Sequence, residues 1–366
     1  MKTSIILVTY NFEKWFNEFF EKIKPILENR EDVELLIVEN KSKDRTAEIF
    51  RKLLLEDETN SAPENIWHAT HLKNTHLYLS SENTFFAKGN NIGMQKAIDN
   101  NSEYVFLLNQ DAFLRDQALE KLEKFMDENK NCASSQGLIM VKETGKINSS
   151  GVSLNYLGIG FCRDFNKDYK QENYKNGENI NYAMGAGCMF RVSVLKEVGL
   201  FPEEYQMYHE DSQLQLKMKY LGHTINLINE PLVDHDYKFG PSSGTYKFYF
   251  TERNRLWNLL TFYKVRTLIV IFPMFFVMEC GMVLYSIMTK WFKLKIKSYF
   301  DLFKGLQKIL KYRKEIQKTR KIKDRDLILE MVDVIQFDSV SNVILDKVTN
   351  TMLRVYYKFL KLIVRW

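Results

Sequence analysis

The stretch YVFLLNQDAF, residues 104–113, decides the fold of this chain. Its unbroken apolar run ends abruptly in Asn109, Gln110 and Asp111. A buried parallel strand has this pattern, and the carboxyl end of such a strand is where α/β folds place ligands. Two interpretations of Asp111 follow. It holds a divalent cation that in turn holds phosphate groups, or it only caps the following turn.

Strand and helix patterns alternate from residue 3 to about residue 127. The strand patterns SIILVTY, VELLIVE, HLYLS and YVFLLN are separated by helix patterns at 15–27, 46–58 and from residue 91. This alternation predicts a parallel sheet with right-handed crossovers. The first strand-to-helix turn, residues 9–13, contains no glycine, which argues against a dinucleotide fingerprint or a P-loop. Residues 132–236 are less regular, and we expect them to complete the same domain.

Size and composition limit the class of protein. The 366 residues, 45% of them hydrophobic, are enough for a catalytic domain plus an appendage. The net charge of +6 is uneven, because basic residues crowd positions 290–325, which indicates a local anionic partner. The four cysteines are too widely spaced to predict a disulfide framework or a zinc site, so a reducing cytosol fits best. The amino terminus is predicted to be a strand rather than a signal peptide.

The last hundred residues have a different character. Residues 268–288 are about long enough to cross a bilayer at roughly 20 residues per span, and Glu279 is their only charge. Because Pro273 and Gly281 interrupt this segment, we expect a re-entrant or interfacial arrangement; a single span and a buried core helix are the alternatives. A cationic amphipathic helix is predicted from Leu302, Phe303, Leu306, Ile309 and Leu310, which recur among lysines, and residues 352–366 repeat the theme. Such helices lie on anionic lipid, and we favour a membrane over nucleic acid as the partner.

Two further motifs follow predicted strands. Glu39 ends the second strand, where a carboxylate can accept hydrogen bonds from a ribose or a base. The motif FFAKGNNIG, residues 85–93, lies between a strand pattern and a helix pattern. There Gly89 is expected to permit a tight turn, and Lys88 and the amino end of the helix to meet phosphate.

Acids and a histidine are found further along the chain. In YHEDSQL, residues 208–214, Glu210 and Asp211 are adjacent and cannot point the same way in a helix. One of them can face a cleft as a general base for a hydroxyl nucleophile, or both can simply place negative charge at the helix start. His235, at the end of another strand-like run, completes a metal site with a distant carboxylate or is an ordinary polar residue.

Eight motifs occur in order along the chain: TYN, VENKSKD, FFAKGNNIG, LLNQDA, GAGCMFR, EVGLF, YHED and LVDH. Together they resemble the family 2 glycosyltransferases of the GT-A fold, and most closely the rhamnosyltransferase-like group that builds polysaccharide chains at membranes. The resemblance covers residues 3–260, including RNR at 253–255. It implies an α/β, Rossmann-like, mostly parallel sheet flanked by helices. We expect this domain at 1–245, a connecting helix at 246–266, a membrane-embedded or re-entrant segment at 267–290 and a basic amphipathic helical tail at 291–366.

The resemblance also implies roles for individual residues. Asp211 matches the catalytic base, Asp111 the ligand of Mg²⁺ or Mn²⁺, and His235 a further metal or diphosphate contact. Contacts to the donor nucleotide are implied for Thr9, Asn11, Glu39, Lys88 and Asn109, and acceptor-side or supporting roles for Gly187, Glu210 and Arg253. The chain departs from the family pattern at four positions: Glu39 replaces the usual Asp, Asn109 stands at the first acid of the Asp-x-Asp motif, Gln213 replaces a frequent acid, and Phe85 replaces Gly.

These roles predict an inverting, metal-dependent hexosyltransferase-type enzyme. Asp211 removes a proton from an acceptor hydroxyl as that hydroxyl attacks the anomeric carbon opposite the diphosphate. The expected donor is dTDP-rhamnose or a UDP-sugar, and the expected acceptor is a lipid-linked saccharide of cell-surface polysaccharide or glycan assembly. The predicted location is the cytoplasmic face of the cell membrane, bound peripherally, by a re-entrant segment or by a single span.

Other classes of protein were weighed against the enzyme. The first alternative is a catalytically degenerate, nucleotide-binding membrane scaffold, which the departures at Asn109 and Gln213 keep open. A nucleotidyltransferase would need a glycine-rich phosphate loop, which residues 9–13 lack. Nucleic acid is not an expected partner, and the sequence leaves the oligomeric state open.

Overall fold

The computed structural model describes residues 1–56, 61–237, 246–336 and 344–366. Its main sheet has the strand order β11-β13-β7-β12-β5-β1-β2-β4-β3, with β6 beside β13 and β8 beside β7. The strands are β1 (Thr3–Thr9), β2 (Val33–Glu39), β3 (Trp67–Ala69), β4 (Thr75–Leu79), β5 (Tyr104–Asn109), β6 (Ala112–Leu114), β7 (Cys132–Val141), β8 (Ile147–Ser149), β11 (Glu178–Asn179), β12 (Gly187–Arg191) and β13 (Thr224–His235). A separate pair is formed by β9 (Val152–Leu154) and β10 (Gly160–Cys162).

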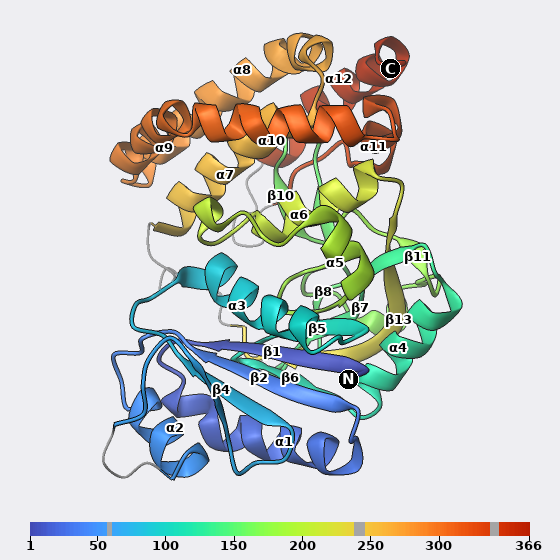
Figure 1. Cartoon of the computed structure of the whole chain (residues 1–366). Helices are drawn as coiled ribbons and strands as arrows, with labels where there is room; N and C mark the ends of the chain where they lie inside the picture. Colours follow the sequence, from blue (N-terminus) through green and yellow to red (C-terminus); the bar gives the residue numbers. More distant parts are fainter. Residues whose placement is uncertain (57–60, 238–245, 337–343) are drawn as a thin grey trace.

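Strands β4, β2, β1 and β5 are parallel neighbours, which confirms the predicted parallel sheet. Their side chains alternate between two buried cores. Ile5 and Leu7 of β1 face the core beneath α1 (Phe16–Asn29), whereas Ile6 faces the core beneath α3 (Phe85–Asp99). Figure 1 shows α1 and α2 (Thr46–Leu54) on one side of these strands and α3 on the other. Burial on both faces explains why the strands are apolar at almost every position.

The remaining helices are α4 (Ala118–Glu128), α5 (Val192–Val198), α6 (Glu210–Tyr220), α7 (Tyr246–Phe262), α8 (Val265–Met288), α9 (Phe292–Lys304), α10 (Leu306–Thr319), α11 (Asp324–Glu330) and α12 (Asn350–Ile363). Helices α7 to α12 stack at the end of the molecule opposite α1 and α2 (Figure 1). The proposed unit boundaries at residues 245, 266 and 290 stay predictions, and residues 238–245 and 337–343 lie outside the described part.

Two predicted helix limits are wrong. The helix expected from residue 91 begins at Phe85, so the FFAKGNNIG motif is helix rather than loop. Gly89 serves close packing instead of a turn, because a Cβ there would lie 2.9 Å from Val8 Cγ1 of β1. The helix predicted to reach residue 58 ends at Leu54, and residue 58 itself falls outside the described residues.

The C-terminal helices correct two further expectations. Helix α8 continues through Pro273 and Gly281, so the predicted re-entrant break is wrong; a proline removes one helical hydrogen bond without reversing the chain. The single amphipathic helix expected around residues 302–310 is divided at Gly305 into α9 and α10. A Cβ on Gly305 would lie 2.5 Å from Trp257 Cζ2, so this junction depends on the absence of a side chain.

Four buried charges join α7, α8 and α9. Arg255 Nη2 lies 2.8 Å from Glu252 Oε2 and also pairs with Glu279. Lys295 Nζ lies 2.8 Å from Glu279 Oε2 and also pairs with Glu252. The two positive and two negative charges balance. Glu279, the one acid of the apolar segment, therefore faces the protein interior rather than the surface.

We expect Glu279→Gln to lower the free energy of unfolding by about 3–5 kcal/mol, because it leaves two buried cations with a single carboxylate. Chemical denaturation of the full chain measures this loss. The control is Glu230→Gln, which removes an exposed ion pair with Lys121 and should cost about 0–1 kcal/mol. Equal losses for the two variants would contradict a structural role for the charge cluster.

Candidate active site

Polar side chains gather where the parallel strands end. Thr9 pairs with Glu39, and Val8 pairs with Asn109, so the carboxyl ends of β1, β2 and β5 form one edge. The Thr9 hydroxyl is buried and has no hydrogen-bond partner among the described residues. The Glu39 carboxylate accepts hydrogen bonds from the backbone of its own loop, with Ser42 N at 2.6 Å. The structure thus brings together three of the residues predicted to contact the donor nucleotide.

The other two predicted nucleotide contacts are already engaged. Asn11 has a φ of 57°, and its Oδ1 accepts a hydrogen bond of 2.8 Å from Lys43 N, which ties the two strand-end loops together. Lys88 lies in the first turns of α3, not in a loop, and its Nζ is 2.8 Å from Glu82 Oε1. The hydrogen bond to Glu82 raises the pKa of Lys88. A phosphate would have to compete with that carboxylate.

Asp111 and His235 meet at the end of β13, although 124 residues separate them. The backbone fixes their approach, since Asp236 N donates to Asp111 O at 2.7 Å. His235 Nδ1 lies 2.9 Å from Asn148 Oδ1, and His235 Nε2 lies 3.2 Å from Asp111 Oδ1. The Asn148 amide orients the imidazole so that Nε2 points at the Asp111 carboxylate. An imidazole nitrogen and a carboxylate oxygen therefore face each other at the end of β13.

This pair suits a divalent cation as a partial ligand set. Within the described ranges no three His, Cys, Asp or Glu side chains cluster as a complete metal site. A carboxylate and an imidazole supply two ligands, and phosphate oxygens and water could supply the others. Asn148, which orients the imidazole, was missed by sequence reasoning. No motif marks it, and only the fold places it beside His235.

The glycine-containing segment 185–187 borders both the strand-end edge and Asp211. Asn109 N donates to Ala186 O at 3.1 Å. A Cβ on Gly185 would lie 3.9 Å from Asp211 Oδ2. Gly187 has a packing role, since a Cβ there would lie 2.9 Å from Val233 Cγ2 of β13. The predicted base and the predicted nucleotide edge therefore flank one short segment.

The two adjacent acids of α6 differ in environment. Asp211 is half-buried, and its Oδ1 accepts a hydrogen bond of 2.7 Å from Ser212 N. Burial raises the pKa of Asp211 to about 6, although backbone hydrogen bonds oppose the shift. Glu210 is buried with Oε2 unpaired, and burial, together with the Asp211 charge, raises the pKa of Glu210 well above its usual value. With a pKa of about 6, Asp211 is ionised at neutral pH.

The turn before α6 is strained. Gln206, Tyr208 and His209 have φ angles of 61°, 65° and 66°, a left-handed conformation that costs non-glycine residues ~1–3 kcal/mol each. His209 is buried, and burial lowers its pKa to about 4, so the imidazole is neutral. Strain of this kind persists only where surrounding contacts enforce it.

Helix α7 supplies those contacts. Asn254 Nδ2 lies 2.9, 3.0 and 2.7 Å from the carbonyl oxygens of Tyr205, Met207 and Tyr208. Arg253 Nη2 donates to Tyr205 O at 3.0 Å. The predicted supporting role of Arg253 thus takes the form of a hold on the turn that leads to Asp211. Sequence reasoning missed Asn254, although it is the centre of the RNR motif.

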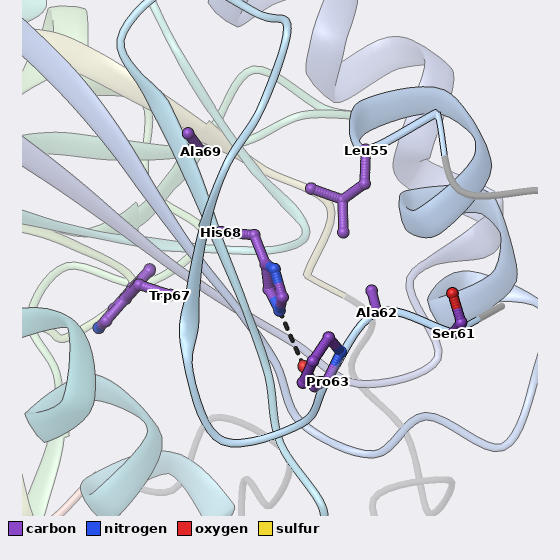
Figure 2. A pocket seen from close by; sticks show the side chains of 7 residues that line it. All are labelled: Leu55, Ser61, Ala62, Pro63, Trp67, His68 and Ala69. Carbon is purple, nitrogen blue, oxygen red and sulfur yellow. Dashed lines mark hydrogen bonds between the residues drawn. The ribbon is translucent and has the colours of Figure 1, made fainter.

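A surface hollow of about 510 Å³ lies elsewhere, beside the edge strand β3. Figure 2 shows its lining, in which His68 Nε2 lies 2.8 Å from Pro63 O. None of the predicted site residues lines this hollow. The candidate active site is consequently defined by the strand ends and not by the hollow.

Comparison with known proteins identifies the family. Residues 4–199, more than half of the chain, match the family model described as glycosyl transferase family 2. The chain belongs to this family. Its central mixed sheet flanked by helices is the GT-A fold that the motifs predicted. The rhamnosyltransferase-like subgroup stays a prediction, and so do the roles of all the predicted site residues.

Solved structures show distant similarity. S. aureus TarS 1–349 in complex with UDP is 20% identical with a TM-score of 0.45, and the alignment covers 71% of this chain and 66% of that one. The corresponding values for S. aureus TarS 1–349 in complex with UDP-GlcNAc are 19%, 0.47, 71% and 67%. For GalNAc-T7 with UDP, GalNAc and Mn²⁺ they are 12%, 0.48, 65% and 43%. This chain thus spans slightly less than two thirds of the UDP-bound TarS chain. No curated protein matches it.

Asn254→Ala should lower the free energy of unfolding by about 1–3 kcal/mol, because the partly buried carbonyl oxygens of Met207 and Tyr208 lose the amide that donates to them. Chemical denaturation measures the change. Asn229→Ala is the matched control, since the exposed amide of Asn229 also donates to a backbone carbonyl, that of Tyr174. The control should change stability by less than about 0.5 kcal/mol. If the two variants are equally stable, Asn254 does not hold the turn.

Proposed function

We propose that the protein is an inverting, metal-dependent glycosyltransferase that moves a sugar from a nucleoside-diphosphate donor to an acceptor hydroxyl. The observation that carries this proposal is the environment of Asp211. A half-buried carboxylate whose pKa burial raises to about 6 lies beside the glycine segment that also borders Asn109. A base of this pKa is ionised at neutral pH and still takes up a proton readily.

The nucleotide is assigned to the strand-end edge. The carboxyl ends of parallel strands are where α/β sheets bind nucleotides. Thr9 offers a buried hydroxyl with no partner in the described chain, and Glu39 offers further lone pairs for a ribose or a base. Asn109, at the end of the central strand β5, is the residue of this edge whose backbone N–H donates to the glycine-containing segment beside Asp211.

Asp111 Oδ1 and His235 Nε2 would hold the divalent cation. The imidazole favours Mn²⁺ over Mg²⁺, because Mg²⁺ prefers a shell made only of oxygen. A bound cation neutralises negative charge on the departing diphosphate. Asn148, whose Oδ1 lies 2.9 Å from His235 Nδ1, would orient the imidazole with Nε2 toward the cation.

The chain's own residues supply the remaining step. Asp211 accepts the proton of the acceptor hydroxyl while the oxygen forms a bond to the anomeric carbon and the bond from that carbon to the diphosphate breaks. Attack from the face opposite the diphosphate inverts the anomeric configuration. Burial and the Asp211 charge raise the pKa of Glu210 well above its usual value, which disfavours a second negative charge beside Asp211.

The finer assignments belong to the same proposal. The donor is dTDP-rhamnose or a UDP-sugar, and the acceptor is a lipid-linked saccharide in cell-surface polysaccharide or glycan assembly. The basic and apolar C-terminal helices support a lipid-linked acceptor, because binding at a surface raises the effective concentration of both reactants.

The rate of sugar transfer is expected to rise with pH through about 6 and to level off above it. Below that pH Asp211 is protonated, so kcat/KM should fall about tenfold per pH unit. Asp211→Asn should lower kcat by about 10²–10⁴-fold while nucleotide affinity is kept. Steady-state kinetics across pH and nucleotide titration by calorimetry measure both effects.

Glu210→Gln is the control for that experiment. An amide does not titrate, so this variant should keep the rise in rate near pH 6 if that rise belongs to Asp211. A nucleotide-binding scaffold without catalysis would show no transfer in either form, and turnover that survives Asp211→Asn would remove Asp211 as the base.

Nucleotide binding should depend on the cation. With a nucleoside diphosphate at about 100 times its dissociation constant, stability rises by roughly 2.7 kcal/mol and the melting temperature by a few degrees. We expect this shift for one of UDP, dTDP and GDP with Mn²⁺, a smaller one with Mg²⁺, and none with chelator or in Asp111→Ala. Thermal-shift measurements test all combinations.

The matched control is Asp116→Ala, which removes an exposed carboxylate five residues away. It should keep the full shift. A nucleotide shift that persists in Asp111→Ala with chelator would contradict a cation held by Asp111.

A further inference from the structure

The outward face of α8 is apolar along its whole length. Exposed residues recur at helical spacing at Val265, Ile269, Phe272, Phe276, Cys280, Leu284 and Ile287. The opposite face packs into a buried core through Ile271, Met274 and Met278. By length and composition α8 is the one helix among the described residues that could cross a membrane, and 28% of its most apolar window is buried.

Helix α12 has three parallel stripes. Its buried stripe includes Leu353, Tyr357 and Leu360. An exposed apolar stripe consists of Met352, Val355, Phe359 and Leu362, and Val348, just before the helix, extends it. Beside it lie exposed Arg354 and Lys358, with Arg365 just after the end of the helix. Residues 347–366 contain no acid, so the surface of α12 is both apolar and positively charged.

The two helices are joined side by side. Tyr356 OH of α12 donates to Val270 O of α8 at 2.5 Å, and Trp366 Nε1 donates to Thr267 Oγ1 at 2.8 Å. Both helices lie at the end of the molecule far from α1 and α2 (Figure 1). Of the 25 large hydrophobic residues that are exposed in the described chain, 20 lie between residues 265 and 363. Such concentration marks an interaction surface rather than ordinary surface exposure.

We infer that the outer faces of α8 and α12 dock on an anionic lipid bilayer, with α8 lying in the plane of the membrane surface and not crossing it. This docking face would bring the enzyme to a lipid-linked acceptor, and in that respect alone it rests on the proposed function. Lipid binding itself requires no sugar transfer, so an experiment can contradict the lipid docking without contradicting the proposed function, and the reverse.

The charge of the docking face favours lipid over a second copy of the chain. Arg354, Lys358 and Arg365 border the apolar stripe of α12, and Arg266 and Lys290 flank that of α8. Two identical faces would bring these like charges together. Anionic headgroups pair with them while the apolar stripes enter the boundary between headgroups and acyl chains.

The inner face of α8 favours the in-plane orientation. Glu279 is held there by Arg255 and Lys295, which belong to α7 and α9. A crossing helix would have to leave these partners or carry all the charges into hydrocarbon, which is costly. An in-plane helix keeps its inner face on the protein.

Co-flotation of the full chain with vesicles tests the docking face. We expect binding to phosphatidylcholine vesicles that contain phosphatidylglycerol, weaker binding to phosphatidylcholine alone, and loss of binding at high salt. Phe272→Asp with Phe276→Asp should lower the bound fraction by at least about tenfold, and Arg354→Glu with Lys358→Glu should do the same. Leu53→Asp is the matched control, since Leu53 is an exposed apolar residue of α2 at the opposite end, and it should bind normally.

Labelling of Cys280 tests whether α8 contacts the membrane in nearly native protein, because Cys280 is exposed in the middle of the apolar face of α8. In a Cys162→Ser background, a membrane-impermeant maleimide should label Cys280 in solution but not on vesicles. Cysteines just outside the two ends of α8, Lys264→Cys and Thr289→Cys, each in a Cys162→Ser and Cys280→Ser background, should both react from outside intact vesicles. If one of the two ends is labelled only after detergent opens the vesicles, α8 crosses the membrane, and the in-plane docking is overturned.

Absence of vesicle binding by the wild type would also overturn the inference. If Cys280 were then protected in lipid-free protein that light scattering shows to be a dimer, the occupant of the face would be a second copy. Neither result would affect nucleotide binding at the strand-end edge.

Discussion

Hydrogen bonds from α7 hold the strained turn before Asp211, and the geometry of the active site rests on them. Three non-glycine residues of this turn are left-handed, and such a conformation relaxes unless its carbonyl groups are held. The Asn254 amide donates to the carbonyl oxygens of Tyr205, Met207 and Tyr208. Its neighbours Glu252 and Arg255 belong to the buried charge cluster with Glu279 and Lys295. One short stretch of α7 thus connects the turn of the proposed base to the helices of the docking face.

Burial gives neighbouring acids different roles in two places. At the start of α6 burial raises the pKa of Glu210 well above its usual value and that of Asp211 to about 6, although Asp211 accepts a backbone hydrogen bond. Between α7 and α8, two acids are instead kept ionised by buried cations, which lower the pKa of Glu252 to about 2 against the effect of burial. The first pair is suited to proton transfer and the second to structure.

The apolar strands and the residues at their ends could be predicted because the carboxyl ends of parallel strands meet at one edge. Thr9, Glu39 and Asn109 do lie there. The start of α3 could not be predicted from the sequence, because its polar residues are typical of a loop. In the structure, Asn91 is buried and its amide donates to Phe201 O at 2.9 Å, a partner 110 residues away. The contact of Asn148 with His235 could not be predicted either, since it forms only when the fold brings β8 to the end of β13.

We propose that the strand ends, the Asp111–His235 pair and Asp211 border one site, which holds both the cation and the donor. A crystal structure of the chain with its stabilising nucleoside diphosphate and Mn²⁺, recorded with anomalous data at the manganese edge, tests it most directly. We expect an anomalous peak for manganese between Asp111 and His235, with the diphosphate next to it. The Asp211 carboxylate should face the side of the anomeric carbon opposite the diphosphate. A nucleotide bound elsewhere, such as in the hollow beside β3, or manganese away from Asp111 and His235, would contradict it.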